Sequence, residues 1–173
     1  MLTQFVKLVP YNPEWKNMFE VDKQLIHHAF QGKVVQIEHI GSTSVPEMWA
    51  KPIIDIAAAV VSFSILDKET IERLAAIGYE YVPKEEFPNR RFFRRGEWGA
   101  GTHHLHIYEH GSEEWENIIM FRDYLRKHKD AAEEYIKLKK QLARQHDRQM
   151  YTVLKGPFIQ AILNNARKEM QKS

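Results

Sequence analysis

The sequence predicts an α/β (α+β) fold in which a mixed β-sheet is flanked by helices and the last third of the chain is helical. Three observations predict it. Residues 34–40 and 53–61 are apolar runs of strand length, and the second is apolar on both faces, which is typical of a central strand. Around these runs, apolar residues recur at helical spacing. From Ser112 onward only the helical pattern remains, so we expect helices to form the final third.

Helices are expected where a capping residue precedes a stripe of apolar positions. Their expected starts are Asn12-Pro13, Asp67, Ser112, Asp130 and Gly156-Pro157. Gly32 and Gly78 end the first two helices. The expected strands are residues 34–40, 53–61, 79–82, 91–95 and 103–109. The last two strands are expected to pair as a hairpin around a glycine-rich turn at residues 96–101, and residues 41–52 form a loop with room for one helical turn.

Length and composition limit the classes of protein to consider. The chain has 173 residues, which suits one domain spanning residues 1–173. Its formal net charge of +2 comes from scattered Lys and Arg, so no nucleic-acid-binding patch is indicated. The absence of cysteine excludes disulfides and thiolate metal sites. No stretch has the layout of a signal peptide or the length of a membrane span, so we expect a soluble cytoplasmic protein. The oligomeric state is not indicated.

The most informative segment joins a Gly-Ser pair to a single carboxylate. Gly41-Ser42 follows the first apolar run, and Asp55 lies inside the second. A carboxylate in such a run is costly unless a metal ion, a cation or hydrogen bonds pair with it. A Gly-Ser loop can bring N–H groups and a hydroxyl to a phosphate, and a carboxylate on the next strand can hold Mg²⁺ against that phosphate. The alternative is a glycine turn with an Asp that pairs internally with Lys51 or His39.

This spacing matches the nucleotidyltransferase-fold signature except at one position. The signature continues with an apolar residue and a second acid, whereas Ile56 and Ala57 follow here. The two-carboxylate clamp of two-metal phosphoryl transfer is therefore incomplete. The candidate to replace the missing acid is Glu38, or a His on the same side of the sheet. Asp55 and Glu38 are accordingly the predicted metal ligands.

A second candidate group lies on the strand at residues 103–109. Alternation places His104, His106 and Tyr108 on one face. Two His at i and i+2 can ligate one metal ion, and a His/carboxylate site forms if this strand neighbours the one that holds Asp55. The alternative is a solvated strand with ordinary His side chains. Since His106 lies mid-strand, it is the better candidate to hydrogen-bond a ligand, and we predict that it acts in catalysis with Asp55.

Basic residues near these motifs can neutralise a phosphate. Lys51 stands at the entrance to the strand of Asp55, and Arg91 lies in an Arg-rich strand beside aromatic residues, which suits phosphate and base recognition. The predicted ligand-binding set is Gly41, Ser42, Thr43, Lys51 and Arg91. Other basic residues are expected to form the solvated face of a helix, namely Lys137, Lys139, Lys140, Arg144 and Arg148.

Six segments together resemble the GrpB family. They are Val9-Pro10-Tyr11-Asn12-Pro13-Glu14-Trp15, Ile37-Glu38-His39-Ile40-Gly41-Ser42-Thr43-Ser44-Val45-Pro46, Ala50-Lys51-Pro52-Ile53-Ile54-Asp55-Ile56, Arg90-Arg91-Phe92-Phe93, His103-His104-Leu105-His106 and Phe121-Arg122-Asp123-Tyr124-Leu125-Arg126. They run in order along nearly the whole chain. The most specific part joins the Gly-Ser loop to Lys-Pro-Ile-Ile-Asp.

The resemblance implies the fold of the nucleotidyltransferase superfamily and a bacterial cytoplasmic setting. Because related domains occur fused to dephospho-coenzyme A kinases, it also implies a connection to nucleotides or coenzyme A. It implies that a non-acidic residue at Ala57 is a family trait. Where the family usually has Pro-Gly-Leu, this chain has Pro46-Glu47-Met48, so we expect a different loop geometry, since Glu disfavours backbone angles open to Gly.

Three functions fit these patterns. The first is a nucleotidyl or phosphoryl transferase assisted by Mg²⁺, with a nucleotide or another phosphorylated small molecule as ligand. The second is a non-catalytic ligand-binding or partner module, which the single acid and the fused relatives favour. The third is a metal protein that uses His104 and His106. The nucleotide hypothesis requires that the Gly-Ser bend and Asp55 lie together beside an open cleft.

Overall fold

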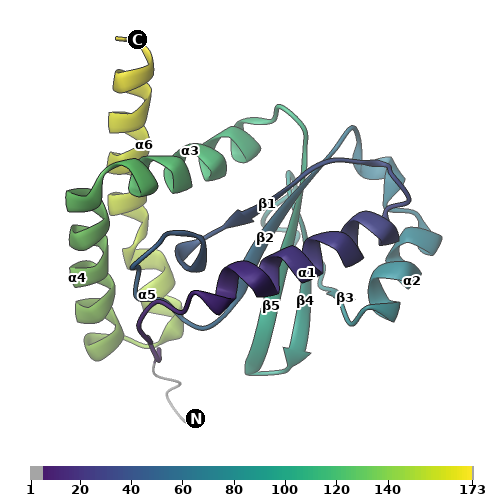
Figure 1. Ribbon diagram of the computed structural model, residues 1–173, viewed down its shortest axis with the longest axis horizontal. Helices are drawn as coiled ribbons and strands as arrows, with labels where there is room; N and C mark the ends of the chain where they lie inside the picture. Colours follow the sequence, from purple (N-terminus) through teal and green to yellow (C-terminus); the bar gives the residue numbers. More distant parts are fainter. Residues whose placement is uncertain (1–5, 173) are drawn as a thin grey trace.

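The computed structural model describes residues 6–172, and a five-stranded mixed sheet lies at its centre (Figure 1). The strands are β1 (Val34–Ile40), β2 (Ile54–Val60), β3 (Glu80–Tyr81), β4 (Arg91–Glu97) and β5 (Ala100–Glu109), in the spatial order β1-β2-β5-β4-β3. The helices are α1 (Glu14–Ala29), α2 (Lys68–Ala76), α3 (Glu113–Lys127), α4 (Lys129–Gln145), α5 (Arg148–Leu154) and α6 (Gly156–Met170). The predicted α/β (α+β) class and the helical final third are confirmed.

The parallel pairing of β2 with β5 brings two distant motifs together. In this register Asp55 lies opposite His104, although 49 positions separate them in the chain. The other strand pairs are antiparallel: β1 with β2, β5 with β4, and β4 with β3. Strand β2 is an inner strand, and every residue in it except Asp55 is buried, which explains its apolar sequence.

Helices α1 and α2 cover one face of the sheet (Figure 1). Asp67 caps α2 as predicted, because its carboxylate accepts a hydrogen bond of 2.8 Å from the N–H of Thr70. A buried ion cluster fastens α1 to the β4–β5 hairpin. In it, both guanidinium Nη atoms of Arg95 donate to Asp22, at 2.5 and 2.7 Å, and Nε2 of His103 lies 2.6 Å from the same carboxylate.

Helix α3 covers the opposite face, and α4, α5 and α6 gather beside it (Figure 1). Trp115, at the start of α3, belongs to an apolar cluster with Ile40, Ala57 and Tyr108 from three strands. A separate apolar cluster joins α3, α4 and α6 to the loop after β1; its buried members are Val45, Met48, Leu125, Ala131, Ala132, Tyr135 and Ile162. The C-terminal helices therefore form a second layer that faces the loop before β2.

Two details of the final third and the hairpin differ from expectation. Helix α4 begins at Lys129 with no side-chain cap bond, so the capping box expected at Asp130 does not form. Helix α5 was not expected; Asp147 caps it by accepting a bond from a backbone N–H. Strands β4 and β5 also extend into the turn expected at residues 96–101, since extra backbone pairs form there.

The loop after β1 holds Glu47 at a backbone angle that favours glycine. Its φ is +63°, in the left-handed region. We expected glutamate to avoid this region, but the loop adopts it despite the side chain. The exposed carboxylate lies 3.4 Å from Nζ of Lys129, at the start of α4. Glu47 thus strains the loop backbone at a point where the loop meets the helical layer.

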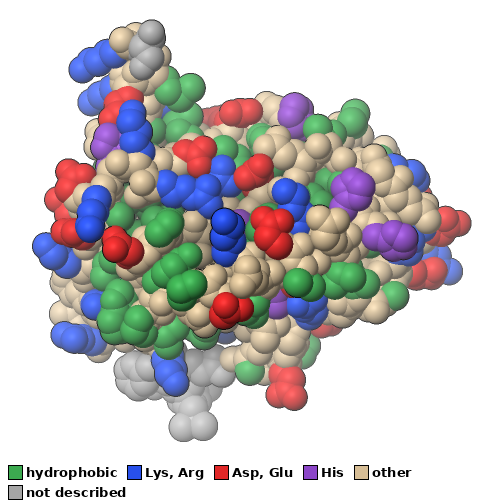
Figure 2. Space-filling view, in the orientation of Figure 1, with side chains coloured by type: hydrophobic (Ala, Val, Ile, Leu, Met, Phe, Trp, Pro, Cys, Tyr) green, Lys and Arg blue, Asp and Glu red, His purple; other side chains and the backbone are tan. Residues whose placement is uncertain are grey.

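The surface carries charges of both signs. On the face that Figure 2 shows, Lys and Arg are interspersed with Asp and Glu. Among the described residues, no helix is both long and apolar enough to cross a membrane.

Candidate anion and metal site

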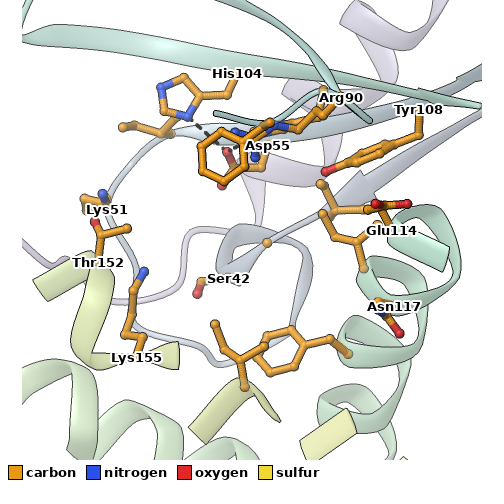
Figure 3. Close-up of a pocket in the computed structure, with 18 of the residues that line it drawn as sticks. Ser42, Lys51, Asp55, Arg90, His104, Tyr108, Glu114, Asn117, Thr152 and Lys155 are labelled. Atoms are coloured by element: carbon orange, nitrogen blue, oxygen red, sulfur yellow. Dashed lines mark hydrogen bonds and ion pairs between the residues drawn. The ribbon is translucent and has the colours of Figure 1, made fainter. Parts of the chain in front are cut away.

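A cavity of about 830 Å³ lies between the sheet and the C-terminal helices (Figure 3). Its polar lining includes Ser42, Lys51, Asp55, Arg90, His104, His106, Arg148 and Lys155, and its apolar lining includes Ile40, Phe121, Tyr135, Tyr151 and Leu163. The volume and the mixture of apolar walls with a few polar groups are typical of a small-molecule site. The Gly-Ser bend and Asp55 both line this cavity, so they meet the spatial condition set by the sequence.

The bend after β1 and Asp55 approach each other closely. Gly41 has φ +68° and ψ −173°, a region open almost only to glycine. A Cβ at this position would lie 2.6 Å from Oδ2 of Asp55, closer than real Cβ contacts come. The loop then makes one 3-10 turn, Ser42–Ser44, in which Oγ of Ser44 donates to the Gly41 carbonyl at 2.6 Å. Gly41 is therefore required by its backbone angle and by the carboxylate beside it.

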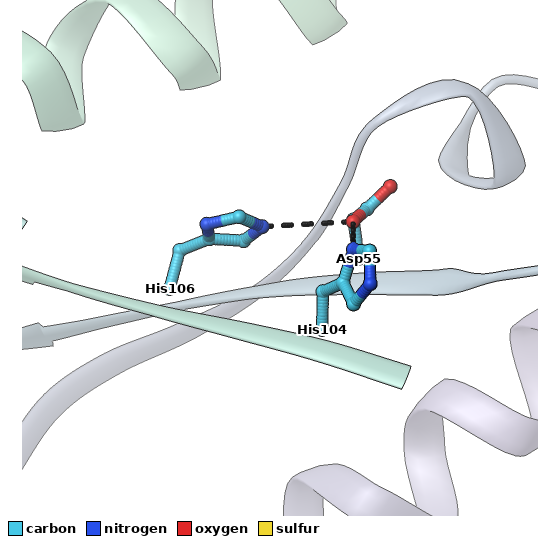
Figure 4. Close-up of side chains that lie close together, drawn as sticks. All are labelled: Asp55, His104 and His106. Carbon is cyan, nitrogen blue, oxygen red and sulfur yellow. Dashed lines mark hydrogen bonds and ion pairs between the residues drawn. The ribbon is translucent and has the colours of Figure 1, made fainter. Parts of the chain in front are cut away.

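Asp55, His104 and His106 form a group at the sheet side of the cavity (Figure 4). Oδ1 of Asp55 lies 3.2 Å from Nδ1 of His104 and 3.5 Å from Nε2 of His106. One ligand atom from each residue lies within 4.8 Å of the others. The internal partner of Asp55 is therefore this His pair, rather than Lys51 or the buried His39.

The local environment sets the charge states of this group. Burial raises the pKa of Asp55, but hydrogen bonds and charge interactions with His104 and His106 outweigh burial and hold the pKa well below its usual range. Burial lowers the pKa of His106, although the Asp55 carboxylate opposes this. Near neutral pH, Asp55 is thus ionised and His106 is neutral.

A lysine cluster, Lys51, Lys139 and Lys155, lies on the helical side. Burial, together with neighbouring cations, lowers the pKa of all three, and the pKa reaches about 7 for Lys139 and about 8 for Lys155. The charge of Asp55 raises the pKa of Lys51 and Lys155. Among residues 6–172, however, no carboxylate forms an ion pair with any of these ammonium groups. The cluster therefore concentrates positive charge without a paired anion.

Ser42 is the point where the lysine cluster meets the Gly-Ser loop. Nζ of Lys139, a side chain only 1% exposed, donates to Oγ of Ser42 at 2.9 Å and to the carbonyl of Trp49. Thr43 also lines the cavity, but its buried hydroxyl lies 2.9 Å from Nε2 of His39. Of the two predicted hydroxyls, Ser42 is thus beside the cations, whereas Thr43 supports the loop.

The prediction that Glu38 replaces the missing acid is not supported by the geometry. Its carboxylate accepts a hydrogen bond of 2.5 Å from Nη1 of Arg122, on α3, and it does not belong to the group around Asp55. Arg122 also donates to the carbonyl of His39. Glu38 therefore serves to attach α3 to β1.

Arg91 is also placed away from the cavity. Alternation along β4 puts Arg91 on the face opposite Phe92, whose ring lies 5.2 Å from that of His106. The guanidinium of Arg91 instead stacks 4.1 Å above the ring of Phe63. The neighbouring Arg90 lines the cavity instead. The Arg-rich segment does contribute one cation to the site, but from the loop position before the strand.

The basic residues of the site that local sequence patterns do not predict come mainly from α4, α5 and the start of α6. Lys139 was expected on a solvated helix face, but it is buried. Arg148 and Lys155 line the cavity from a region where one helix was not foreseen. Lys139 recurs with Tyr135 and Leu142 at helical spacing, which would have placed it on the apolar stripe.

The donor set does not match the clamp that the sequence signature implies. Mg²⁺ prefers oxygen ligands in octahedral geometry. The group offers one carboxylate and two imidazoles, Ala57 stands where the second acid would be, and Glu38 is held by Arg122. Such a donor set suits ions that accept imidazole nitrogen better than it suits Mg²⁺.

Comparison with known proteins shows the family. The model of the family described as "GrpB protein" matches residues 5–165. The chain belongs to the GrpB family. It is 38% identical over 165 residues to the UPF0157 protein YqkA of Bacillus subtilis, covering 94% of this chain and 48% of YqkA, so it spans about half of that relative. It is 35% identical to the glutamate-rich protein GrpB of Alkalihalophilus pseudofirmus, covering 92% of this chain and 94% of that one.

Solved structures agree with this placement of the fold. The crystal structure of the conserved protein GrpB from Enterococcus faecalis superposes with a TM-score of 0.86 at 36% identity, covering 95% of this chain and 99% of that one. The Cid1 poly(U) polymerase in its MgGTP-bound structure superposes with a TM-score of 0.53 at 13% identity, covering 79% of this chain and 44% of Cid1. The predicted nucleotidyltransferase-like fold is therefore confirmed.

This chain also matches part of a larger enzyme. The chain is 28% identical over 180 residues to the dephospho-CoA kinase of Mycobacterium bovis, covering 88% of this chain and 44% of the kinase. This agrees with the expectation that related domains occur within such kinases.

Proposed function

We propose that the cavity binds the phosphate groups of a phosphorylated small molecule, with a nucleotide as the preferred class. The observation that carries the proposal is the lysine cluster. The buried Lys139 and the half-buried Lys51 and Lys155 lie close enough that Lys51 lowers the pKa of the other two, and no carboxylate among residues 6–172 forms an ion pair with any of them. A cation taken out of water is unfavourable unless it is paired. A bound polyphosphate would supply the missing negative charge.

The rest of the cavity supports a ligand with an apolar or aromatic part. Lys155, Lys51 and Ser42 lie in the same part of the cavity, away from Tyr108 and Glu114 (Figure 3). Tyr108 and Phe121 line the cavity toward α3. A ligand that places phosphates among the lysines would thus have aromatic surface available for a base. The cavity volume lies within the range of sites for ligands of this size.

Calorimetric titration of the full chain with ATP, GTP, CTP, UTP and inorganic triphosphate tests the proposal. Each titration is run with and without Mg²⁺, which remains the cofactor that the sequence predicts. We expect heat of binding with at least one nucleotide. Lys155→Met should weaken binding by about 10-fold or more, because a hydrogen bond to a charged group contributes about 1.5–3 kcal/mol. Lys51→Met should act in the same direction.

Lys137→Met is the matched control, because Lys137 is an exposed residue of α4 outside the cavity. It should leave binding unchanged. No heat and no change in melting temperature with any of the ligands would refute the proposal. Equal losses in Lys155→Met and Lys137→Met would also refute it, since the effect would then be one of net charge.

Nucleotidyl transfer is a second candidate function, supported by the Cid1-like fold and by the ionised Asp55 at the cavity wall. In this proposal Asp55 and His106 are the catalytic residues, and the ligand-binding residues are Gly41, Ser42 and the lysine cluster. Incubation with radiolabelled nucleoside triphosphates and candidate acceptors would detect transfer. The buffer should resemble the cytoplasm, which is the location that the sequence predicts. Tight binding without turnover, unchanged by Asp55→Asn, would favour the non-catalytic module instead.

A further inference from the structure

The spacing within the Asp55–His104–His106 group fits a metal site, and its internal polar contacts are long. A good N–H···O bond spans about 2.7–3.2 Å. The distances from Oδ1 of Asp55 to the two imidazole nitrogens are 3.2 and 3.5 Å, so one is at the upper limit and the other is beyond it. Around an ion with bonds of about 2.0–2.1 Å in tetrahedral geometry, ligand atoms lie roughly 3.3 Å apart. The two separations between Asp55 and the imidazole nitrogens fit that spacing, and the three ligand atoms all lie within 4.8 Å of one another.

The ligand side chains are held in place before any ion arrives. Asp55 and His104 are direct partners in the parallel β2/β5 pair, and His106 lies two residues further along on the same face. The ring of Phe92 packs at 5.2 Å against the rings of both His104 and His106, and Tyr108 stacks at 6.5 Å on His106. Central strands and aromatic packing fix the rings, which lowers the entropy lost when an ion binds.

One side of the group remains accessible. His104, His106 and Asp55 are 21%, 14% and 29% exposed, and all three line the cavity. Three protein ligands with a free position toward a cavity are typical of a metal site that admits water or another ligand. The nitrogen of His106 that faces Asp55 is Nε2, so this is the atom available to the ion.

We propose that Asp55, His104 and His106 bind a divalent first-row transition ion, such as Zn²⁺ or Co²⁺, in preference to Mg²⁺. Imidazole nitrogen is a good ligand for these ions, whereas Mg²⁺ requires oxygen ligands. The site shares the cavity with the proposed phosphate ligand but does not need that ligand. Its metal affinity can therefore be measured without nucleotide, and its failure would leave the lysine cluster untouched.

The test uses the full chain after removal of metal by a chelator. Co²⁺ is titrated and followed by visible absorption, which reports nitrogen ligation and low coordination number, and Zn²⁺ is titrated by calorimetry. We expect a Co²⁺ spectrum distinct from that of the hydrated ion, and displacement of Co²⁺ by Zn²⁺ but not by a large excess of Mg²⁺. His106→Gln and Asp55→Asn should each weaken Zn²⁺ binding at least about 100-fold, because loss of even an outer hydrogen-bond partner costs roughly 10–100-fold.

His110→Gln is the control, because His110 is exposed just beyond β5 and does not line the cavity. It should bind Zn²⁺ as the wild type does. Circular dichroism and urea denaturation check that each variant is folded; if Asp55→Asn is not, His106→Gln and His104→Gln decide the result. Zn²⁺ binding that survives in both His variants would overturn the proposal, as would a Co²⁺ spectrum of the hydrated ion or displacement of Co²⁺ by equimolar Mg²⁺.

Discussion

Replacing Gly41 by alanine tests the close approach on which the cavity depends. The backbone there has φ +68° and ψ −173°, which costs a non-glycine residue roughly 1–3 kcal/mol. The new Cβ would also meet Oδ2 of Asp55 at 2.6 Å. Either the loop or the carboxylate must move, which loosens the contacts of Asp55 with His104 and His106, each contributing about 1 kcal/mol.

Together these terms predict that Gly41→Ala lowers the free energy of unfolding by roughly 2–5 kcal/mol. For a chain of this length each kcal/mol corresponds to about 2–4 °C, so the melting temperature should fall by roughly 4–20 °C. Calorimetry and urea denaturation measure both quantities. Metal binding should weaken in the same variant, because the displaced carboxylate is one of the proposed ligands.

Gly111→Ala separates crowding from backbone strain. Gly111 also has positive φ, +76°, but a Cβ there would meet no atom within 4 Å. It should cost only about 1 kcal/mol, the usual penalty for a left-handed residue. In an Asp55→Ala background the cost of Gly41→Ala should decrease, since the crowded carboxylate is gone. If Gly41→Ala and Gly111→Ala were equally destabilising, the inferred contact between the bend and Asp55 would be refuted.

Three further predictions concern stability. Burial and neighbouring lysines lower the pKa of Lys139 to about 7 in the folded chain. Above that pH the folded chain binds fewer protons than the unfolded chain, so stability rises with pH. The charge of Lys139 therefore destabilises the fold fully below pH 7 and progressively less as pH rises. Lys139→Met should therefore be most favourable, relative to wild type, near pH 6, and the difference should shrink by up to about 1.4 kcal/mol per pH unit between pH 7 and 9; urea denaturation showing a constant difference would contradict this. Glu38→Gln should lower stability by about 1–3 kcal/mol, because Arg122 loses its charged hydrogen-bond acceptor, yet it should leave Zn²⁺ affinity unchanged. A large loss of Zn²⁺ affinity would show that Glu38 does act at the metal site. Glu47→Gly should raise the melting temperature by a few degrees, since it relieves about 1 kcal/mol of left-handed strain; a lower melting temperature would show that the contact with Lys129 outweighs that strain.

Local sequence patterns predicted the sheet side of the site well. Alternation placed His104 and His106 on one face, and the apolar run around Asp55 indicated an inner strand. What the sequence left conditional was whether these two strands are neighbours. That depends on a parallel pairing between segments 49 positions apart, and no local pattern specifies such a pairing.

The helical side could not be predicted to the same degree. Lys137, Lys139 and Lys140 are close in sequence, and only the packing of α4 decides which of them is buried. The prediction for the Arg-rich segment chose the wrong arginine for a related reason. Alternation along the strand separated Arg91 from Phe92 correctly. Arg90, however, lines the cavity from a loop, where the alternation of strand side chains does not apply.

The two histidines that follow each other in β5 face opposite sides of the sheet. His103 lies against Asp22 beneath α1, whereas His104 lies against Asp55 in the cavity. If β5 slipped by one position, either Leu105 would replace His104 opposite Asp55, or Thr102 would replace His103 beside Asp22. A slip in either direction therefore leaves one buried or half-buried carboxylate without its imidazole, so the polar groups of the site also favour correct strand alignment while the chain folds.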